Sequence, residues 1–388
     1  LGYEWNAIGS GANGAVCALA FDRLDYCLYV GGDFTASGGL TLNHIARVEG
    51  GSYGGEWYAL GSGTNARVSS LLLENSSPFI DNSLPLYIGG DFTTAGGVGA
   101  NSIAKWNGTT WSALGSGLMY GWFGARVLAL TKMGSSIYAA GDFMNAGGKD
   151  AVNIARWDGS SWYAAGSTSG SGFHFGYAEI LALATDVVTL YAGGNFTTVG
   201  GRTVNHIAQW NGTVWDSLGS GTNGSVLALA INEYVGPIPQ GTLCIGGSFQ
   251  FSGGLQSNYF ATWYNSKWGA AGNGMDGQVW AFAVSGNHVY AGGDFTYAGG
   301  VSVNQIATWN GTCWNSLGSG TNYAVHAIAV IGSDIYVGGG FDSAGGVSAN
   351  SIAKWNGVNW SPLGNGTNGW VYALAVKGTD LYAGGDFT

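Results

Sequence analysis

Hydrophobic positions along this chain recur in short runs, and Gly, Asn and Asp separate one run from the next. The run VYALAV at 371–376, for example, alternates small and large apolar side chains. Short apolar runs bounded by turn-forming residues are typical of β-strands, and no segment shows the 3.6-residue period of an amphipathic helix. The pattern predicts an all-β fold.

Two phrases each return eight times, and together they define a repeat. Both keep the same phase, which gives one module of about 46 residues, the size of a four-stranded propeller blade. Variants of Gly-Gly-Asp-Phe-Thr place Phe at 34, 92, 143, 196, 249, 295, 341 and 387, and variants of Trp-x-x-Leu-Gly-Ser-Gly place Trp at 5, 57, 111, 162, 215, 268, 314 and 360.

Each module is predicted to hold four antiparallel strands. The final module places the first strand at 371–376 and the second at 381–385, and an earlier module places the third at 102–106 and the fourth at 111–114. Asn-Gly pairs separate the third strand from the fourth, and we predict type I′ turns there because both residues tolerate a positive φ. Repeated units of this kind predict a β-propeller. The pairs lie at 107–108, 211–212, 310–311 and 356–357, with Asp158-Gly159 equivalent.

The repeated residues have a packing explanation. Paired glycines at the end of the second strand, as at Gly292-Gly293, permit close backbone approach or an unusual φ. The Phe and the two Trp of each module are expected to fill the space between neighbouring sheets. We expect one domain over residues 1–388, an eight-bladed propeller in which the strand at Trp5 joins the closing strands. The alternatives are a seven-bladed ring closed near Gly357 or an open spiral within a longer array.

A family resemblance follows from these residues. LYVGGDF at 28–34, then a strand ending in Trp and a second Trp five residues later, resembles the kelch-type blade, and the match extends from Trp5 to Thr388. The longer phrase GGDFTxAGGxxxNxIAxWNG is similar to repeats of large secreted bacterial proteins and of fungal cortical-marker ectodomains. The resemblance implies a propeller at the cell surface. The chain departs from the pattern at Val48, Ser248 and Gln250.

Composition mainly excludes partners. Of 388 residues 72 are Gly and 9% are charged, with 12 Lys plus Arg, 22 Asp plus Glu and a formal net charge of −10. Without a basic cluster we expect neither nucleic acid nor an anionic membrane as a partner. No apolar stretch approaches the roughly 18 residues that a membrane span requires. Because the chain begins at Leu1 inside a motif, we expect a processed product or an excerpt of a longer polypeptide.

The residues that could carry chemistry have simpler structural explanations. The Asp after each double glycine could belong to a ring of cation ligands, yet an Asp there is expected to accept backbone N–H bonds, and Asn195 and Ser248 replace it in two modules. His44 and His206 share a repeat position that Ser, Ile or Gln fills elsewhere, which argues against catalysis. The repeated Asp residues are Asp33, Asp91, Asp142, Asp294 and Asp386.

Other catalytic arrangements are also not indicated. The repeated Ser of Leu-Gly-Ser-Gly has no His and Asp in a consistent place, and the Tyr, His and modified Cys of kelch-like copper oxidases have no identifiable counterpart. Cys17 and Cys27 flank one predicted hairpin, where they could form a disulfide or remain two buried thiols, and Cys244 and Cys313 show no metal-ligand spacing. We predict no catalytic residue, no metal site and no cofactor.

Acceptor sequences for N-glycosylation are numerous. Asn107, Asn211 and Asn310 are expected at exposed hairpin tips, where a glycan would not disturb packing, so we predict occupancy there first if the protein passes through a eukaryotic secretory pathway. A chain rich in Asn, Gly, Ser and Thr also produces such sequences by chance. The remaining acceptors are Asn75, Asn195, Asn223, Asn359 and Asn365.

Four segments interrupt the repeat, at 74–85, 117–125, 167–177 and 232–241. Insertions into repeats map to surface loops and often to the binding face. The second and third of them concentrate apolar side chains, which predicts an interaction site; the alternative is that they fold back to plug the channel. The candidate residues are Met119, Tyr120, Trp122, Phe123, Phe173, His174, Phe175 and Tyr177.

The sequence favours a non-enzymatic structural or adhesion scaffold of a cell-surface or extracellular assembly, such as a filament subunit. The alternative is a carbohydrate-binding or carbohydrate-active propeller that uses Trp and Tyr as stacking platforms. Such a site should break the repeat with clustered polar and aromatic residues on one face. Because Trp5 opens a fourth strand and Thr388 ends a second one, we also predict that chain beyond residue 388, or a neighbouring subunit, adds the missing strand.

Overall fold

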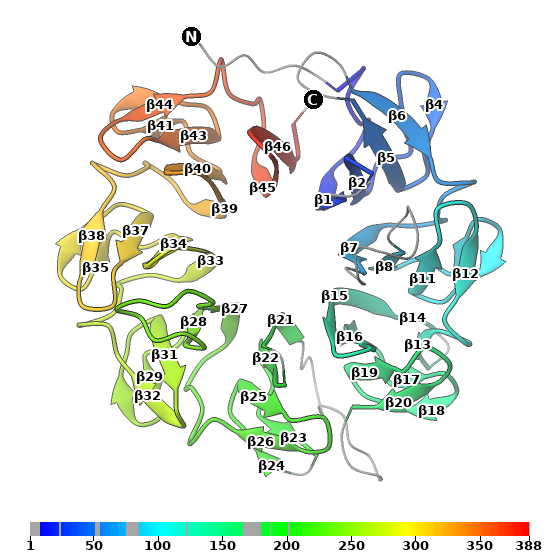
Figure 1. The fold of residues 1–388 in the computed structure, drawn as a ribbon, viewed down its shortest axis with the longest axis horizontal. Helices are drawn as coiled ribbons and strands as arrows, with labels where there is room; N and C mark the ends of the chain where they lie inside the picture. The colour runs from blue at the N-terminus through cyan, green and yellow to red at the C-terminus, as the bar shows by residue number, and fades with distance from the viewer. Residues whose placement is uncertain are drawn as a thin grey trace. The chain divides into compact units, whose positions relative to one another are not determined.

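The computed structural model describes residues 8–22, 25–50, 55–74, 85–121, 123–165, 180–186, 188–200 and 202–387. The predicted all-β fold is confirmed. The chain divides into two compact units, one mainly of Asn6–His174 with Ala375–Asp386 and the other mainly of Phe175–Leu374. Each unit is built from four-stranded antiparallel sheets that follow one another along the chain (Figure 1).

The unit of Asn6–His174 contains three of these sheets with longer strands, a further four-stranded sheet of short strands in the order β14-β13-β17-β18, and several two-residue strands. Sheet 1 comprises β1 (Val16–Asp22), β2 (Cys27–Gly32), β5 (Ile45–Glu49) and β6 (Glu56–Ala59); sheet 2 comprises β7 (Val68–Leu73), β8 (Leu86–Gly90), β11 (Ile103–Trp106) and β12 (Trp111–Ala113); sheet 3 comprises β15 (Arg126–Met133), β16 (Ser136–Asp142), β19 (Ile154–Trp157) and β20 (Trp162–Ala164). The shorter strands are β3 (Ala36–Ser37), β4 (Leu40–Thr41), β9 (Thr94–Ala95), β10 (Val98–Gly99), β13 (Leu118–Tyr120), β14 (Phe123–Gly124), β17 (Asn145–Ala146) and β18 (Lys149–Asp150).

The other unit contains four such sheets. Sheet 4 comprises β21 (Ile180–Thr185), β22 (Leu190–Gly194), β25 (Ile207–Trp210) and β26 (Trp215–Ser217); sheet 5 comprises β27 (Val226–Ile231), β28 (Leu243–Gly247), β31 (Phe260–Tyr264) and β32 (Lys267–Gly269); sheet 6 comprises β33 (Val279–Ser285), β34 (His288–Gly293), β37 (Ile306–Trp309) and β38 (Trp314–Ser316); sheet 7 comprises β39 (Val325–Ile331), β40 (Asp334–Gly339), β43 (Ile352–Trp355) and β44 (Trp360–Pro362). The shorter strands are β23 (Thr198–Val199), β24 (Arg202–Thr203), β29 (Phe251–Ser252), β30 (Leu255–Gln256), β35 (Tyr297–Ala298), β36 (Val301–Ser302), β41 (Ser343–Ala344) and β42 (Val347–Ser348). The chain continues with a hairpin of β45 (Val371–Lys377) and β46 (Asp380–Gly385), which from Ala375 onward belongs to the unit of Asn6–His174.

Sheets 1–7 each keep their strands in chain order, from a first strand to a fourth. The predicted strands at 102–106, 111–114, 371–376 and 381–385 match β11, β12, β45 and β46 to within one residue. First strands of consecutive sheets lie side by side within a unit, as β33 and β39 do (Figure 1). Together with the β45–β46 hairpin, the described sheets amount to about eight modules, as the repeat predicted.

Type I′ turns occur, but not at the Asn-Gly pairs, so that prediction is wrong. Four residues separate the paired Trp106 and Trp111, and among these four only Gly108 has a positive φ. The Asn107 side chain closes the loop instead, since its oxygen accepts the Thr109 and Thr110 N–H groups. Two-residue turns with two positive φ values instead follow the Phe of each repeat, where the sequence analysis expected no strands. They join the two-residue strands, as at Gly96-Gly97 between β9 and β10.

The double glycine meets two different obstacles, which confirms the predicted close approach; in β16 the first of the two positions is Ala140. A Cβ on Gly292 would lie 2.6 Å from Val325 Cγ1 in the next sheet, and a Cβ on Gly293 would lie 1.9 Å from the Gln278 carbonyl oxygen in its own sheet. The second obstacle comes from a β-bulge near the start of the first strand, where the register shifts between Val279 and Ala281. Side chains are therefore excluded at both glycines.

Within each unit, consecutive sheets are joined by the Trp of the later sheet's fourth strand. The Trp111 indole N–H donates to the Leu60 carbonyl of the preceding sheet at 2.7 Å, and this carbonyl also accepts the Gly63 N–H of the Leu-Gly-Ser-Gly turn. Trp162, Trp268, Trp314 and Trp360 repeat the bond at 2.5–3.0 Å, to Leu114, Leu218, Ala271 and Leu317. The Phe of the repeat is fully buried in sheets 1–7, whereas Phe387 of the last module is half-buried. Each hydrophobic cluster within a unit thus lies between two consecutive sheets.

The structure also bears on the cysteines and on the expectation that no segment spans a membrane. All four cysteines are free thiols, and burial raises the pKa of Cys27 to about 11 and that of Cys244 to about 12, so both thiols stay protonated. Within the described part of the chain there is no helix of the length and hydrophobicity that a membrane crossing needs. The predicted opening strand at Trp5 lies outside the described residues.

We expect Trp111→Phe to lower the free energy of unfolding by about 1 kcal/mol more than Trp106→Phe. Both indoles are almost buried, with 7% and 8% exposure, but Trp106 donates no hydrogen bond to any residue that the structure describes. The difference isolates the bond to Leu60, since one buried hydrogen bond contributes about 1 kcal/mol. Chemical denaturation of both variants measures it, and equal destabilisation would refute the role of the bond.

A second prediction concerns the β31–β32 turn, where Asn265 and Ser266 have φ values of 47° and 57°. Ser266→Gly should stabilise the protein by about 0.5–1 kcal/mol, because glycine adopts this conformation without the cost that an L side chain meets. Ser161→Gly, in the corresponding loop of sheet 3 but outside the positive-φ region, should destabilise it slightly. Thermal melts compare the two; a lower melting temperature for Ser266→Gly contradicts the prediction.

Candidate binding site

The predicted interaction residues are only partly described. Met119 and Tyr120 are exposed on β13, which pairs with β14 and β17, and the Met144 N–H donates to the Met119 carbonyl at 2.9 Å. Met144 is exposed as well, and we call these three exposed apolar residues, which lie on adjacent backbone segments, the patch of Met119, Tyr120 and Met144. Phe123 belongs to β14, whereas Trp122, Phe173, His174, Phe175 and Tyr177 lie outside the described residues. The structure therefore places two of the predicted side chains together.

The described glycosylation acceptors differ in their surroundings. Asn107 and Asn211 are exposed, and their side-chain oxygens accept hydrogen bonds from Thr109 and Thr213 of the acceptor sequence. Asn310 is half-buried, because the ordered insertion at 232–241 covers its loop: a Cβ on Gly311 would lie 3.1 Å from Ile238. Of the others, Asn223, Asn359 and Asn365 are exposed, Asn195 is half-buried, and Asn75 lies outside the described residues.

Three of the repeated Asp residues, Asp33, Asp142 and Asp294, have partners within the protein, whereas Asp91 Oδ1 is buried without a hydrogen-bond partner in the described structure. Arg67 pairs with Asp33 through both carboxylate oxygens, and its hydrogen bonds lower the pKa of Asp33. Arg126 lies 3.8 Å from Asp142, and Asp294 accepts the Gln278 backbone N–H at 2.6 Å, as the sequence analysis expected of this Asp. Burial raises the pKa of Asp91. Among the residues that the structure describes, no group of three or more His, Cys, Asp or Glu side chains could hold a metal ion.

The repeat position of His44 and His206 has an unusual backbone. Its residue has a φ between 60° and 69° in all seven sheets, because its N–H donates to the preceding Phe carbonyl and its carbonyl accepts from the second glycine. The occupants are His44, Ser102, Asn153, His206, Tyr259, Gln305 and Ser351. His206 Nδ1 is buried without a hydrogen-bond partner in the described structure, and burial lowers the pKa of this imidazole.

His206 should therefore reduce stability in mild acid. Because its pKa is lower in the folded state, the unfolded chain binds the extra proton first, and stability falls as the pH drops below the unfolded value of about 6.5. We expect His206→Gln to lose less unfolding free energy than the wild type between pH 7.5 and 5. The reverse exchange at the equivalent position, Gln305→His, should lose more. Parallel stability curves for the three proteins would contradict this assignment.

A cluster that the sequence analysis missed lies on the first strands of the unit of Phe175–Leu374. The His326 ring stacks on Trp280, with ring centroids 4.9 Å apart and an interplanar angle of 7°, and on Trp370 at 5.7 Å and 23°. Tyr372 meets His326 edge-on at 5.6 Å and Trp370 at 6.3 Å. Trp370 is 52% exposed and Tyr372 is 40% exposed. We call these four residues the aromatic cluster.

The β-bulges explain why these rings meet. Trp280 and His326 are the bulged residues of β33 and β39, which lie side by side, and a bulged residue is free of the regular register and is aimed differently from its neighbours. Tyr372 has the same repeat position in β45. A third side chain fixes the stack, because the Trp280 indole N–H donates to Gln278 Oε1 at 3.0 Å.

Trp370 depends on another departure from the repeat. Gly340 occupies the position that holds Asp, Asn or Ser in the first six sheets, and a Cβ there would lie 3.0 Å from Trp370 Cε2. An aspartate at this position would crowd the indole and place a carboxylate against it. Gly340 and Trp370 therefore form a matched pair. This exchange in an otherwise regular phrase was the signal that could have located the cluster from the sequence.

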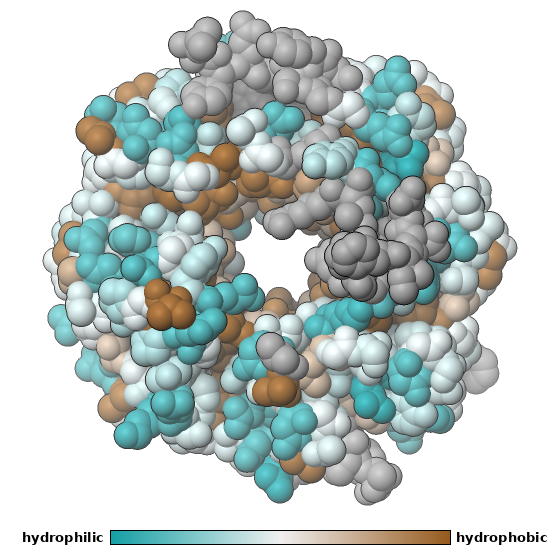
Figure 2. Space-filling view, viewed as in Figure 1, coloured by the Kyte–Doolittle hydropathy of each residue, from teal (hydrophilic) through white to brown (hydrophobic). Residues whose placement is uncertain are grey.

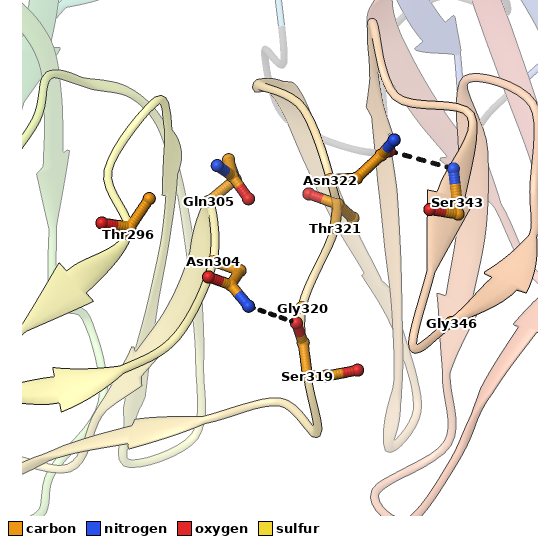
Figure 3. Close-up of a pocket in the computed structure, with 9 residues that line it drawn as sticks. All are labelled: Thr296, Asn304, Gln305, Ser319, Gly320, Thr321, Asn322, Ser343 and Gly346. Atoms are coloured by element: carbon orange, nitrogen blue, oxygen red, sulfur yellow. Dashed lines mark hydrogen bonds between the residues drawn. The ribbon is translucent and has the colours of Figure 1, made fainter.

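A polar groove of about 360 Å³ adjoins the same segments. In Figure 3, Asn304 and Gln305 lie on one side of the groove opposite residues 319–321 of the loop before β39, and the Asn322 side chain points away from them toward Ser343. Asn304 Nδ2 donates to the Ser319 carbonyl at 2.8 Å, and Asn322 Oδ1 accepts the Ser343 N–H at 3.0 Å. Asn322 lies four residues before His326. The nine lining residues carry no formal charge; they are Thr296, Asn304, Gln305, Ser319, Gly320, Thr321, Asn322, Ser343 and Gly346.

Solved structures resemble the whole chain. The computationally designed Ika8 protein aligns over 99% of this chain and 97% of its own, at 15% identity and a TM-score of 0.63. Sqt1 of Saccharomyces cerevisiae aligns over 100% of this chain and 97% of its own, at 9% identity and a TM-score of 0.59. Repeated four-stranded sheets with adjacent first strands agree with this likeness. The fold is a β-propeller.

Comparison of the sequence with known sequences identifies no family. No protein-family model matches the chain. A stretch of 155 residues is 29% identical to the "Polarized growth protein L1" of Phoma sp. (strain ATCC 20986 / MF5453), and it covers 37% of this chain and 11% of that protein. The chain thus spans about a tenth of the relative's length. At this identity and coverage the match is a partial resemblance.

Proposed function

We propose that this propeller is a non-enzymatic scaffold of a cell-surface or extracellular assembly. The observation that supports the proposal best is the division of each module into an invariant joint and a variable surface. The Trp-to-carbonyl bond recurs within both units and the double glycine ends six of the seven second strands of sheets 1–7, whereas the left-handed residue and the bulge residue vary, the bulge residue being Cys, Ser, Leu, Trp or His. A framework of this kind holds binding surfaces in fixed positions, which suits protein partners.

The kelch-like type is part of the same proposal. The double glycine that ends each second strand and the Trp pair of the third and fourth strands, such as Trp106 and Trp111 at 5.1 Å, agree with that blade pattern. Polarized growth, which the relative's name states for that protein, is compatible with a cell-surface setting.

The surface supports an extracellular, glycosylated scaffold. Figure 2 shows hydrophobic residues in small patches separated by hydrophilic ones, and with 9% charged residues most of this hydrophilic surface is neutral. Exposed Asn107 and Asn211 would carry glycans on loops that pack against no core cluster. The patch of Met119, Tyr120 and Met144 is the proposed contact for a protein partner.

Self-association into a filament is a further part of the proposal. Among the described residues β46 has a single strand partner, β45, and a strand from another subunit could pair with its other edge. The alternative function, carbohydrate binding, is favoured by the aromatic cluster and is argued below.

Brief protease treatment of intact source cells should release peptides of this chain before any cytoplasmic marker appears. Glycopeptide mass spectrometry of the same material should find Asn107 and Asn211 occupied if the source has a eukaryotic secretory pathway. Asn356 is the matched control, because its loop has the same Asx geometry but Val358 in place of the hydroxyl residue. Peptides that appear only after lysis, with both asparagines bare, would refute the extracellular scaffold.

A further inference from the structure

The aromatic cluster is a local departure from the repeat. At the bulge position, three consecutive first strands hold Trp280, His326 and Tyr372. The other five strands hold Cys17, Ser69, Leu128, Leu181 and Leu227. Residues that serve the common framework recur in every module, as the paired Val or Ile one position earlier does. A run of rings confined to neighbouring modules therefore serves something other than the framework.

The rings are held rigidly. His326 is sandwiched between Trp280 and Trp370, and Gln278 fixes the Trp280 indole. Trp370 also packs on the backbone of Gly340. Rigid aromatic side chains lose little conformational entropy when a ligand binds, so they give contact area at low cost. The exposed parts of Trp370 and Tyr372 are the accessible surface of this arrangement.

We infer that Trp370 and Tyr372, together with the adjoining groove, bind a neutral oligosaccharide. A pyranose ring has an apolar C–H face that packs on an indole or phenol ring, and its edge carries hydroxyl groups that both donate and accept hydrogen bonds. In the groove, Asn304 Oδ1 and the hydroxyl groups of Ser319 and Ser343 have no hydrogen bond to another residue that the structure describes, so they can bond to such hydroxyls. Sugar sites combine these two kinds of group.

The charges around the site select a neutral ligand. None of the nine groove residues is ionisable. The nearby Asp342 accepts the Asn322 amide at 2.6 Å, and Asp294 accepts the Gln278 N–H at 2.6 Å, so both carboxylates are engaged within the protein. Burial lowers the pKa of His326, which keeps its ring uncharged at neutral pH. No Lys or Arg belongs to the cluster or the groove, so an acidic sugar has no counter-charge there.

The test uses the full chain and a panel of defined probes. Cellohexaose, laminarihexaose, mannohexaose and xylohexaose represent neutral sugars, tetragalacturonate an acidic sugar, and tetramethylammonium a cation that aromatic clusters bind. Saturation-transfer NMR and titration calorimetry should detect at least one neutral hexaose. Trp370→Ala should weaken that sugar at least tenfold, and Tyr372→Ala at least fivefold, while Tyr372→Phe should stay within twofold of the wild type.

Matched controls separate the site from general damage. Tyr264→Ala removes a phenol of similar exposure, 38%, on the β31–β32 hairpin and should leave sugar binding unchanged. Gly340→Asp should weaken sugar binding by displacing Trp370, and circular dichroism should show all variants folded. Failure of every neutral hexaose at millimolar concentration, equal binding by folded Trp370→Ala and Tyr372→Ala, or tighter binding of tetragalacturonate or tetramethylammonium would each overturn the inference.

Discussion

The hydrogen bond from the fourth-strand indole to the turn of the preceding sheet is the interaction on which each unit depends. The acceptor, such as the Leu60 carbonyl, belongs to the Leu-Gly-Ser-Gly turn that follows the fourth strand of the preceding sheet, where it also accepts the Gly63 N–H. The indole bond therefore fixes one sheet against the turn of the sheet before it. Since each joint links nearest neighbours, stability should grow by repeated local steps, as in other repeat proteins. The buried Phe and the Trp pairs then fill the space that this joint defines.

The bulge imposes the second constraint and explains several residues at once. By shifting the register at the start of the first strand, it brings a carbonyl against the second glycine and leaves the next sheet's Val against the first. Both glycines follow from this geometry, and so does the freedom of the bulged side chain. The same irregularity that fixes the framework residues thus creates the place where Trp280 and His326 can stack.

The sequence was sufficient to predict the framework, because framework residues recur. The all-β fold, the four strands of a module, the close approach at Gly292 and the buried aromatics all follow from repeated letters. The two-residue strands were missed because Gly-Gly turns were taken for parts of a loop, and the Asn107 turn was misassigned because its side chain, rather than a positive φ, closes it. The aromatic cluster could not be predicted from spacing alone. Its members are distant in the chain, and they meet only because first strands of consecutive sheets are adjacent.

The bulged residue can also be substituted during evolution more easily than its neighbours. It has no cross-strand partner, so its side chain can be exchanged without altering register, turn geometry or the joint to the next sheet. The neighbouring Val or Ile is nearly uniform across the modules, whereas the bulged position holds Cys, Ser, Leu, Trp or His. Each module therefore offers one site where a single substitution should cost little stability. A lineage of such proteins could acquire or lose ligands by point mutation at these sites, and a designer could do the same.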